Sequence, residues 1–101
     1  MVKDINSYTR ITTIATAGAV TQVVTGQAIL ERIIVGATTA VIVGVIDNTS
    51  GTTVNVNKIG SRTNGAIANT YWYGVQVGTG IRIITTGATT VAPDITVVWR
   101  Q

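Results

Sequence analysis

The sequence has no cysteine, no histidine and no phenylalanine, and it contains a single proline and a single methionine. Without cysteine, the chain has neither disulfides nor thiolate ligands for a metal. Without histidine, it lacks the commonest general base, the commonest metal ligand and the usual activator of a nucleophile. These absences predict a protein that is not an enzyme and that holds no cofactor and no metal.

Charged residues are also scarce, with seven basic and four acidic side chains and a net charge of +3. The basic residues stand singly along the chain, whereas nucleic-acid binding requires neighbouring cations that neutralise several phosphates. The carboxylates, Asp4, Glu31, Asp47 and Asp94, follow no spacing that would pair two of them for acid–base catalysis. We therefore expect no catalytic residues and no nucleic-acid partner.

A long hydrophobic run is missing as well. The most apolar stretch without a charge covers residues 33–46, and a membrane-spanning helix requires about 20 apolar residues. Gly36 and Gly44 also interrupt this stretch. It predicts two buried strands joined by a turn, and no membrane among the partners.

β-Branched residues are abundant, with 19 threonines, 15 valines and 14 isoleucines. Such side chains lose rotamer freedom in helices and pack well on pleated sheets. Short segments of this kind, separated by turn residues, are typical of a sandwich or barrel. The sequence predicts an all-β protein: a polar arm at residues 1–7, then a single antiparallel, jelly-roll-like β-sandwich at 8–101. About eight strands are expected, at residues 8–15, 20–25, 28–35, 39–46, 52–59, 66–77, 80–85 and 94–100.

Turn residues punctuate these strands. Residues 47–51, Asp-Asn-Thr-Ser-Gly, predict a turn with Asx-type hydrogen bonds and a final glycine at positive φ. Asn64-Gly65 predicts a hairpin, and Gly78-Thr79-Gly80 predicts a tight turn with no phosphate-binding helix behind it. Gly74 is expected to bend the long sixth strand.

Two of the predicted strands are apolar on both faces, at residues 33–35 and 41–46. A two-layer sandwich buries only one face of each sheet. The second face therefore requires a cover, for which another subunit is the first hypothesis. A loop or the N-terminal arm of the same chain is the alternative.

Glu31 and Arg32 are the first candidate interaction residues, because they stand inside an apolar strand. Strict alternation places one charge on each face of that strand. Either the segment lies at a sheet edge in water, or the charges form a salt bridge across a subunit interface.

Tyr71, Trp72 and Tyr73 are the second candidate group and include three of the five aromatic residues. Alternation places Trp72 on the opposite face of the strand from Tyr71 and Tyr73. Either one ring lies in the core and two lie on the surface, or the three form a contact patch, since Tyr and Trp are enriched at interfaces. A sugar site also requires nearby polar side chains, and the sequence shows no such grouping.

Four segments between residues 28 and 101 share their pattern with a known group of proteins. Residues 29–35 read ILERIIV and a following strand ends in DNTSG at 47–51, similar to an "LHRIIV" strand and a "YDNT" strand end. Residues 80–88 read GIRIITTGA and residues 94–100 read DITVVWR, similar to a glycine-led strand with a Thr/Ala/Gly turn and a final "DITVVYR" strand. In these segments the chain resembles small virion proteins of tailed bacteriophages. Glu31 replaces a histidine and Trp99 a tyrosine of that pattern.

The resemblance implies a small β-sandwich used as a head decoration, cement or fibre protein, often trimeric and without catalytic residues. We therefore expect a structural virion protein on the capsid surface, synthesised in the host cytoplasm. Its expected partners are copies of itself, as a homotrimer, and the major capsid protein or other virion proteins. A tail or fibre module that binds a receptor or a glycan is the alternative.

Overall fold

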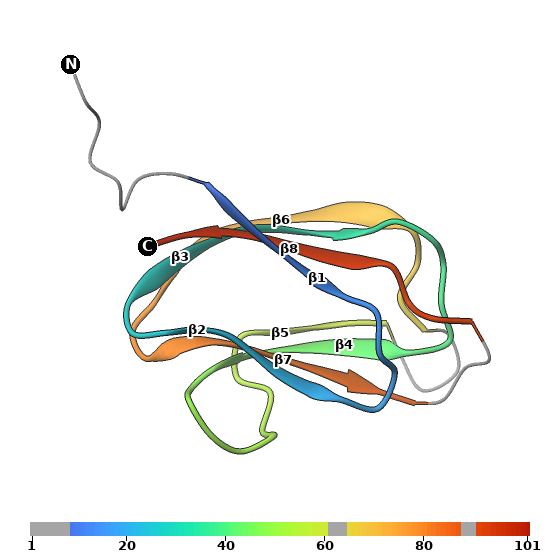
Figure 1. The fold of residues 1–101 in the computed structure, drawn as a ribbon, viewed down its shortest axis with the longest axis horizontal. Coiled ribbons are helices and arrows are strands. Elements are labelled where there is room, and N and C mark those ends of the chain that lie inside the picture. The colour runs from blue at the N-terminus through green and yellow to red at the C-terminus, as the bar shows by residue number, and fades with distance from the viewer. Residues whose placement is uncertain (1–8, 61–64, 88–90) are drawn as a thin grey trace.

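The structure is a computed structural model that describes residues 9–60, 65–87 and 91–101 (Figure 1). The arm expected at residues 1–7 lies outside this part of the chain. The described residues form strands and loops and no helix. The strands, in chain order, are β1 (Arg10–Ile14), β2 (Val20–Thr25), β3 (Ala28–Val35), β4 (Ile42–Asp47), β5 (Asn57–Ile59), β6 (Asn69–Val77), β7 (Gly80–Thr86) and β8 (Ile95–Arg100).

The strands form two antiparallel four-stranded sheets that pack face to face (Figure 1). Sheet A has the order β1-β8-β3-β6, and sheet B has the order β2-β7-β4-β5. The hydrogen-bonded pairs include β1 with β8, β2 with β7, β3 with β6 and β4 with β5. The chain is thus one long antiparallel ribbon, folded at β4–β5 and rolled up on itself, which is the topology of a jelly roll. The predicted all-β sandwich is confirmed.

The core lies between the two sheets and consists of aliphatic side chains. Alternate residues point into it, as the period of two along a strand requires. In β8, Ile95, Val97 and Trp99 face the core, as the sequence predicts. Other fully buried members of the core are Leu30, Ile33, Val43, Val45, Ile81 and Ile83.

One predicted strand is largely wrong. Residues 52–59 alternate like a strand, but only Asn57–Ile59 pair as β5. Residues 48–56 form a loop that passes across the outer face of sheet B (Figure 1). The strands expected to begin at residues 39 and 66 begin later, at Ile42 and Asn69, since the preceding residues connect one sheet to the other.

This loop supplies the cover that the doubly apolar β4 requires. A Cβ atom on Gly44 would lie 2.6 Å from Cγ2 of Val54 and 2.7 Å from Cγ2 of Ile84. The valine of the loop therefore packs into the space that a side chain at residue 44 would fill. Ile46, which points away from the core, is only 1% exposed. The first hypothesis, a second subunit as the cover of β4, is therefore wrong, and the alternative of a loop from the same chain is confirmed.

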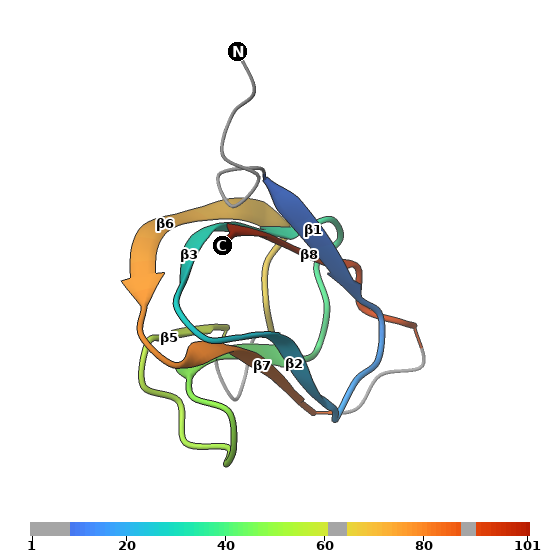
Figure 2. The ribbon, with the colours of Figure 1, turned by 60° about the vertical axis from the view of Figure 1, so that its left-hand side comes forward.

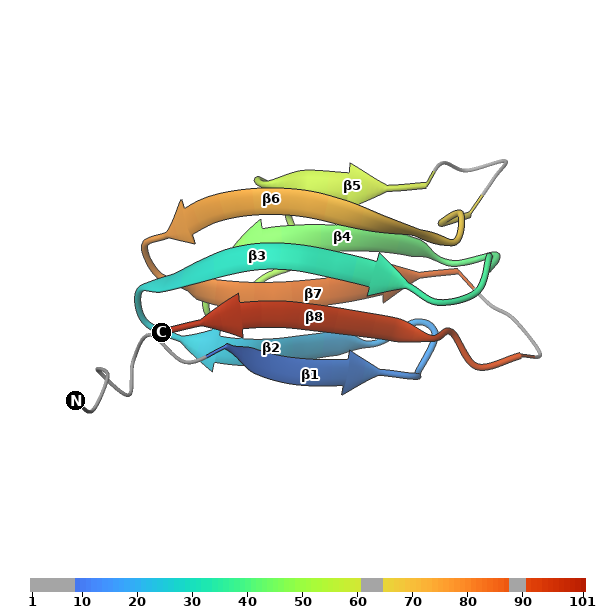
Figure 3. The ribbon, with the colours of Figure 1, turned by 90° about the horizontal axis from the view of Figure 1, so that it is seen from above.

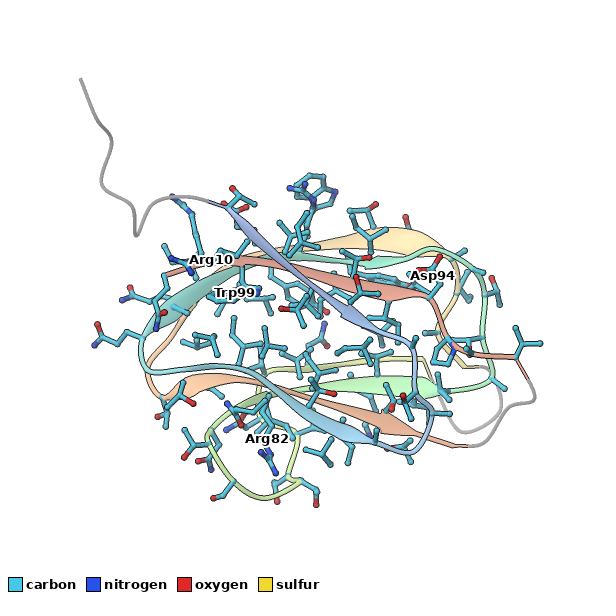
Figure 4. The ribbon with its side chains drawn as sticks, viewed as in Figure 1. Arg10, Arg82, Asp94 and Trp99 are labelled. Carbon is cyan, nitrogen blue, oxygen red and sulfur yellow. The ribbon has the colours of Figure 1, made fainter. Side chains whose placement is uncertain are left out.

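Polar contacts fasten the loop to the sandwich. The side-chain oxygen of Asn48 accepts a hydrogen bond from the amide of Thr49, and Gly51 has φ +79, as predicted for this turn. The guanidinium of Arg82 in β7 points toward the loop and donates to the carbonyl of Gly51 at 2.8 Å and to Oε1 of Gln22 at 2.9 Å (Figure 4). One charged side chain therefore ties two strands of sheet B to the loop that covers them.

The turn at residues 78–80 joins β6 of sheet A to β7 of sheet B and is tight, as predicted. The carboxylate of Asp47 accepts hydrogen bonds from the amides of Gly78 at 3.0 Å, Thr79 at 2.8 Å and Gly80 at 3.2 Å. These bonds hold the pKa of Asp47 below its ordinary value of 3.8, with the largest effects from Gly78 and Thr79, and burial opposes them. Backbone donors that could cradle a phosphate thus hold a carboxylate of the same chain.

The hairpin predicted at Asn64-Gly65 is wrong. Asn64 lies outside the described residues, but the strands on either side, β5 and β6, belong to different sheets and do not pair. Gly65 instead lets its own backbone lie close to the backbone of Thr39 and Ala40, because a side chain at residue 65 would collide with them.

Candidate functional site

Among the residues that the structure describes, no loop crosses the outer face of sheet A, in contrast to that of sheet B (Figures 1 and 3). The strand register sets Ile11 beside Val98, Val98 beside Arg32, and Arg32 beside Trp72, in one row across all four strands. The two ends of the row are the most exposed, with Ile11 at 68% and Trp72 at 73%. An apolar side chain therefore stands in solvent at each edge of this face.

A β-bulge in β3 determines how Glu31 and Arg32 point. The register with both neighbouring strands shifts between Leu30 and Arg32: against β8 the extra residue lies in β3, whereas against β6 it lies in β6. Leu30 and Ile33 remain in the core, and both charged side chains lie on the outer face, half-buried. The prediction of one charge on each face is therefore wrong, because the bulge breaks the alternation.

Of the two explanations offered for these charges, the edge position is wrong, and a salt bridge across a subunit interface stays a prediction. β3 lies between β8 and β6, so the pair is not at a sheet edge. Glu31 forms its salt bridge within the chain, with Oε1 2.9 Å from Nε of Arg100 on β8. Nε of Arg100 is buried and makes no hydrogen bond, so the contact is an ion pair. The two side chains remain partly in solvent, where such a pair stabilises by less than about 1 kcal/mol.

The three aromatic residues of β6 alternate as predicted. The sequence predicts one ring in the core and two on the surface, and the structure has two in the core and one on the surface. Tyr71 and Tyr73 pack against the core, and Trp72 alone points outward. The hydroxyl of Tyr71 donates to the carbonyl of Ile67 at 2.7 Å, and that of Tyr73 accepts from Nδ2 of Asn57 at 3.1 Å. Burial raises the pKa of Tyr73 above its ordinary value. Trp72 is therefore the member of the group that can contact a partner.

Trp72 and Arg32 meet on the outer face. The guanidinium carbon of Arg32 lies 5.1 Å from the centroid of the Trp72 ring, a cation–π distance. Beside this pair the surface forms an open depression of about 600 Å³, here called the hollow, lined by Ile29, Glu31, Arg32, Trp72, Tyr73, Gly74, Gln76 and Arg100. The structure thus gathers polar side chains around an exposed ring, a grouping that the sequence did not reveal.

Gln76 and Arg100 are the residues of the hollow that sequence reasoning missed. They come from different strands and flank Ile29 of β3 on its two sides in the register. Only that register brings them together, so the sequence carries no local signal for the grouping.

The far edge of sheet A is formed by β1, here called the β1 edge, with no strand beyond it among the described residues. Its pairing with β8 is continuous over Arg10–Ile14, without a bulge. Its one charged residue, Arg10, points to the end of the core, where its guanidinium carbon lies 5.6 Å from the centroid of the Trp99 ring (Figure 4). The strand therefore offers open backbone groups and the exposed Ile11.

Within residues 9–60, 65–87 and 91–101, no three His, Cys, Asp or Glu side chains gather in a way that could hold a metal ion. Asp94 lies at the end of the sandwich away from Arg10 and Trp99 (Figure 4). The described part of the chain also contains no helix that is long and apolar enough to cross a membrane.

Comparison of the chain with models of protein families, with curated proteins and with solved structures found no match.

Proposed function

We propose that this protein is a non-enzymatic structural component of a tailed-phage virion, most specifically a decoration or cement protein of the capsid. Two observations support the proposal: the sequence resemblance of residues 28–101 to small phage virion proteins, and the jelly-roll order of the strands. Jelly rolls occur among viral capsid proteins, although lectins and cupins share them, so the topology alone supports a structural role only by analogy.

The β1 edge is the observation that carries the assembly part of the proposal. An edge strand with free backbone groups can pair with a strand of another chain, and soluble proteins normally block such edges with charges or bulges. β1 has no bulge, its one charge is turned toward Trp99, and its Ile11 is 68% exposed. We propose that further copies of the chain cover this edge, as a trimer.

Such a protein acts by physical means. Each contact that forms only between folded, assembled subunits shifts the equilibrium away from free and unfolded chains by mass action. A rigid sandwich bound across neighbouring copies of the major capsid protein stabilises the shell in this way. The tail or fibre remains the alternative location, because the same sandwich serves there.

Light scattering after size exclusion tests the assembly. We expect the chain, at 10.5 kDa, to elute with three times that mass. Ile11→Lys adds a charge at the β1 edge and should convert the trimer to a monomer at the same concentration. Ile67→Lys is the matched control, because Ile67 is 60% exposed but lies away from β1, and it should leave the mass unchanged. A monomeric wild-type chain, or a trimer that survives Ile11→Lys, would contradict the proposed contact.

The virion placement requires a separate measurement. Antibody labelling of purified particles should place the protein on heads at many copies per particle. Labelling of tails alone would favour the fibre alternative, and absence of the protein from particles would refute the virion proposal.

A further inference from the structure

The hollow on the outer face of sheet A arises from irregularities in two neighbouring strands. The bulge in β3 turns Glu31 and Arg32 outward together, and Gly74 in β6 has φ +62 where its register with β3 shifts. β6 bends sharply toward sheet B at its end (Figure 2). β-Bulges commonly re-aim side chains beside functional sites. The resulting space of about 600 Å³ lies within the range of small-molecule sites.

Trp72 gives the hollow an aromatic surface. Its side chain is 73% exposed even though Arg32 lies against it, so much of the indole is available to a ligand. The face of an indole carries negative potential and attracts cations and polarised C–H groups. A pyranose ring, which is lined with C–H groups on its faces and with hydroxyls around its rim, matches such a surface.

Polar groups stand where the hydroxyls of such a ring would lie. Gln76 offers both a donor and an acceptor, and the ion pair of Glu31 with Arg100 offers an acceptor and further donors. Because Glu31 is already paired with Arg100, it does not neutralise Arg32 as well. Arg32 has no carboxylate within salt-bridge distance among the described residues. One positive charge of the hollow is therefore uncompensated.

We propose that the hollow binds a sugar that carries a carboxylate, with the ring against Trp72 and the carboxylate against the guanidinium of Arg32. A planar guanidinium binds a carboxylate through two parallel hydrogen bonds, which an ammonium cannot imitate. A second copy of the chain fits this place less well, since two of the three carboxylate side chains among the described residues, Glu31 and Asp47, are engaged within the chain and only Asp94 is left to oppose Arg32. The site lies apart from the β1 edge, so the inference does not depend on the proposed assembly.

Tryptophan fluorescence of the full chain can observe this site directly. Trp72 is 73% exposed and Trp99 only 8%, so a ligand in the hollow should alter the red-shifted emission of Trp72 and leave that of Trp99. The probe is D-glucuronic acid, with D-glucose as its neutral counterpart and acetate as the carboxylate alone, all at constant ionic strength. We expect glucuronic acid to bind with a Kd of about 1 mM and the other two compounds roughly tenfold more weakly.

Variants separate the two contacts. Arg32→Gln should weaken glucuronic acid roughly tenfold, to the level of glucose, without changing the response to glucose. Trp72→Phe should abolish the fluorescence change, and Ile11→Lys, on the same face but outside the hollow, should change neither Kd. Circular dichroism establishes that each variant is folded, and Gln76→Ala serves in place of Arg32→Gln if that variant does not fold.

Three results would overturn the inference: no fluorescence change with glucuronic acid, equal responses to glucuronic acid and acetate, or unchanged binding in both Arg32→Gln and Gln76→Ala. An oligoglutamate peptide that alters Trp72 emission at lower concentration than glucuronic acid would assign the hollow to an acidic protein segment, and it would overturn the sugar proposal as well.

Discussion

The outer faces of the two sheets differ, although their strands read alike in the sequence. On sheet B, the outward-facing Ile46 is 1% exposed beneath the loop of residues 48–56. On sheet A, no loop of the described residues crosses (Figure 3), and the outward-facing Trp72 and Ile11 at its two edges are 73% and 68% exposed, whereas Val98 between them is 1% exposed. One face is covered within the chain, and the other leaves an apolar side chain in solvent at each of its two edges.

The difference arises from the connections between strands. β2 and β3 are joined by two residues, and so are β6 and β7, whereas β4 and β5 are joined by residues 48–56. Connections between paired antiparallel strands usually have about two to five residues, so this one is longer than usual. Here it is folded against the sheet by Val54, Asn55 and Arg82 and acts as a lid on apolar residues. Doubly apolar strands therefore indicate an intermolecular interface only where no connection of this length can fold back.

The largest expected effect comes from a cavity beneath that lid. Ile46→Ala should lower the free energy of unfolding by about 2–4 kcal/mol, because it empties a covered site. Trp72→Thr removes a larger side chain from the open face, yet it should cost less than about 1 kcal/mol, since most of that side chain is already in water. Urea unfolding of both variants measures the difference. Similar losses in the two variants would show that the faces are not distinct.

A smaller effect is expected from the carboxylate at the end of β4. Asp47→Asn should destabilise the protein by about 1 kcal/mol at neutral pH, because the charged acceptor of three backbone amides is lost. The folded pKa of Asp47 lies below the unfolded one, so its contribution is present above about pH 4 and disappears as the pH falls through the folded pKa.

Urea unfolding at a series of pH values measures this linkage. As the pH falls below about 4, the wild-type chain should lose stability more steeply than Asp47→Asn, by the share that Asp47 contributes. Parallel curves for the two proteins would contradict the assignment of the low pKa to this carboxylate.

Much of the fold follows from the sequence because β-branched residues and turn residues carry local information. β2 and β3 have the predicted bounds, and the turns at Gly51 and Gly78 form as expected. The prediction of a strand at residues 52–59 is largely wrong, because Val54 and Val56 alternate with polar residues in the same way whether the segment pairs with a strand or packs on the face of a sheet. The missing side chain of Gly44 admits Val54, but the alternation of residues 52–59 carries no information about that space.

The candidate site was less predictable for the same reason. Trp72 could be recognised as facing away from Tyr71 and Tyr73, because alternation is local. The bulge that turns Glu31 and Arg32 outward together depends on the pairing with β6 and β8, and so does the approach of Arg100 to Glu31. Register across strands is a tertiary property, and one shifted residue changes which side chains share a face.

The smallest expected effect tests whether charge or burial holds the lid. Arg82→Met removes hydrogen bonds to Gly51 and Gln22 while retaining most of the aliphatic stem, and it should cost about 0.5–1 kcal/mol. Hydrogen exchange should report the loss more clearly than global unfolding, through faster exchange of the Val56 amide, which donates to the carbonyl of Val45. Arg32→Met is the matched control on the open face, where it should leave Val56 protected. If Arg82→Met leaves that amide equally protected, the packing of Val54 and the hydrogen bonds of Asn55 hold the loop without a contribution from the arginine.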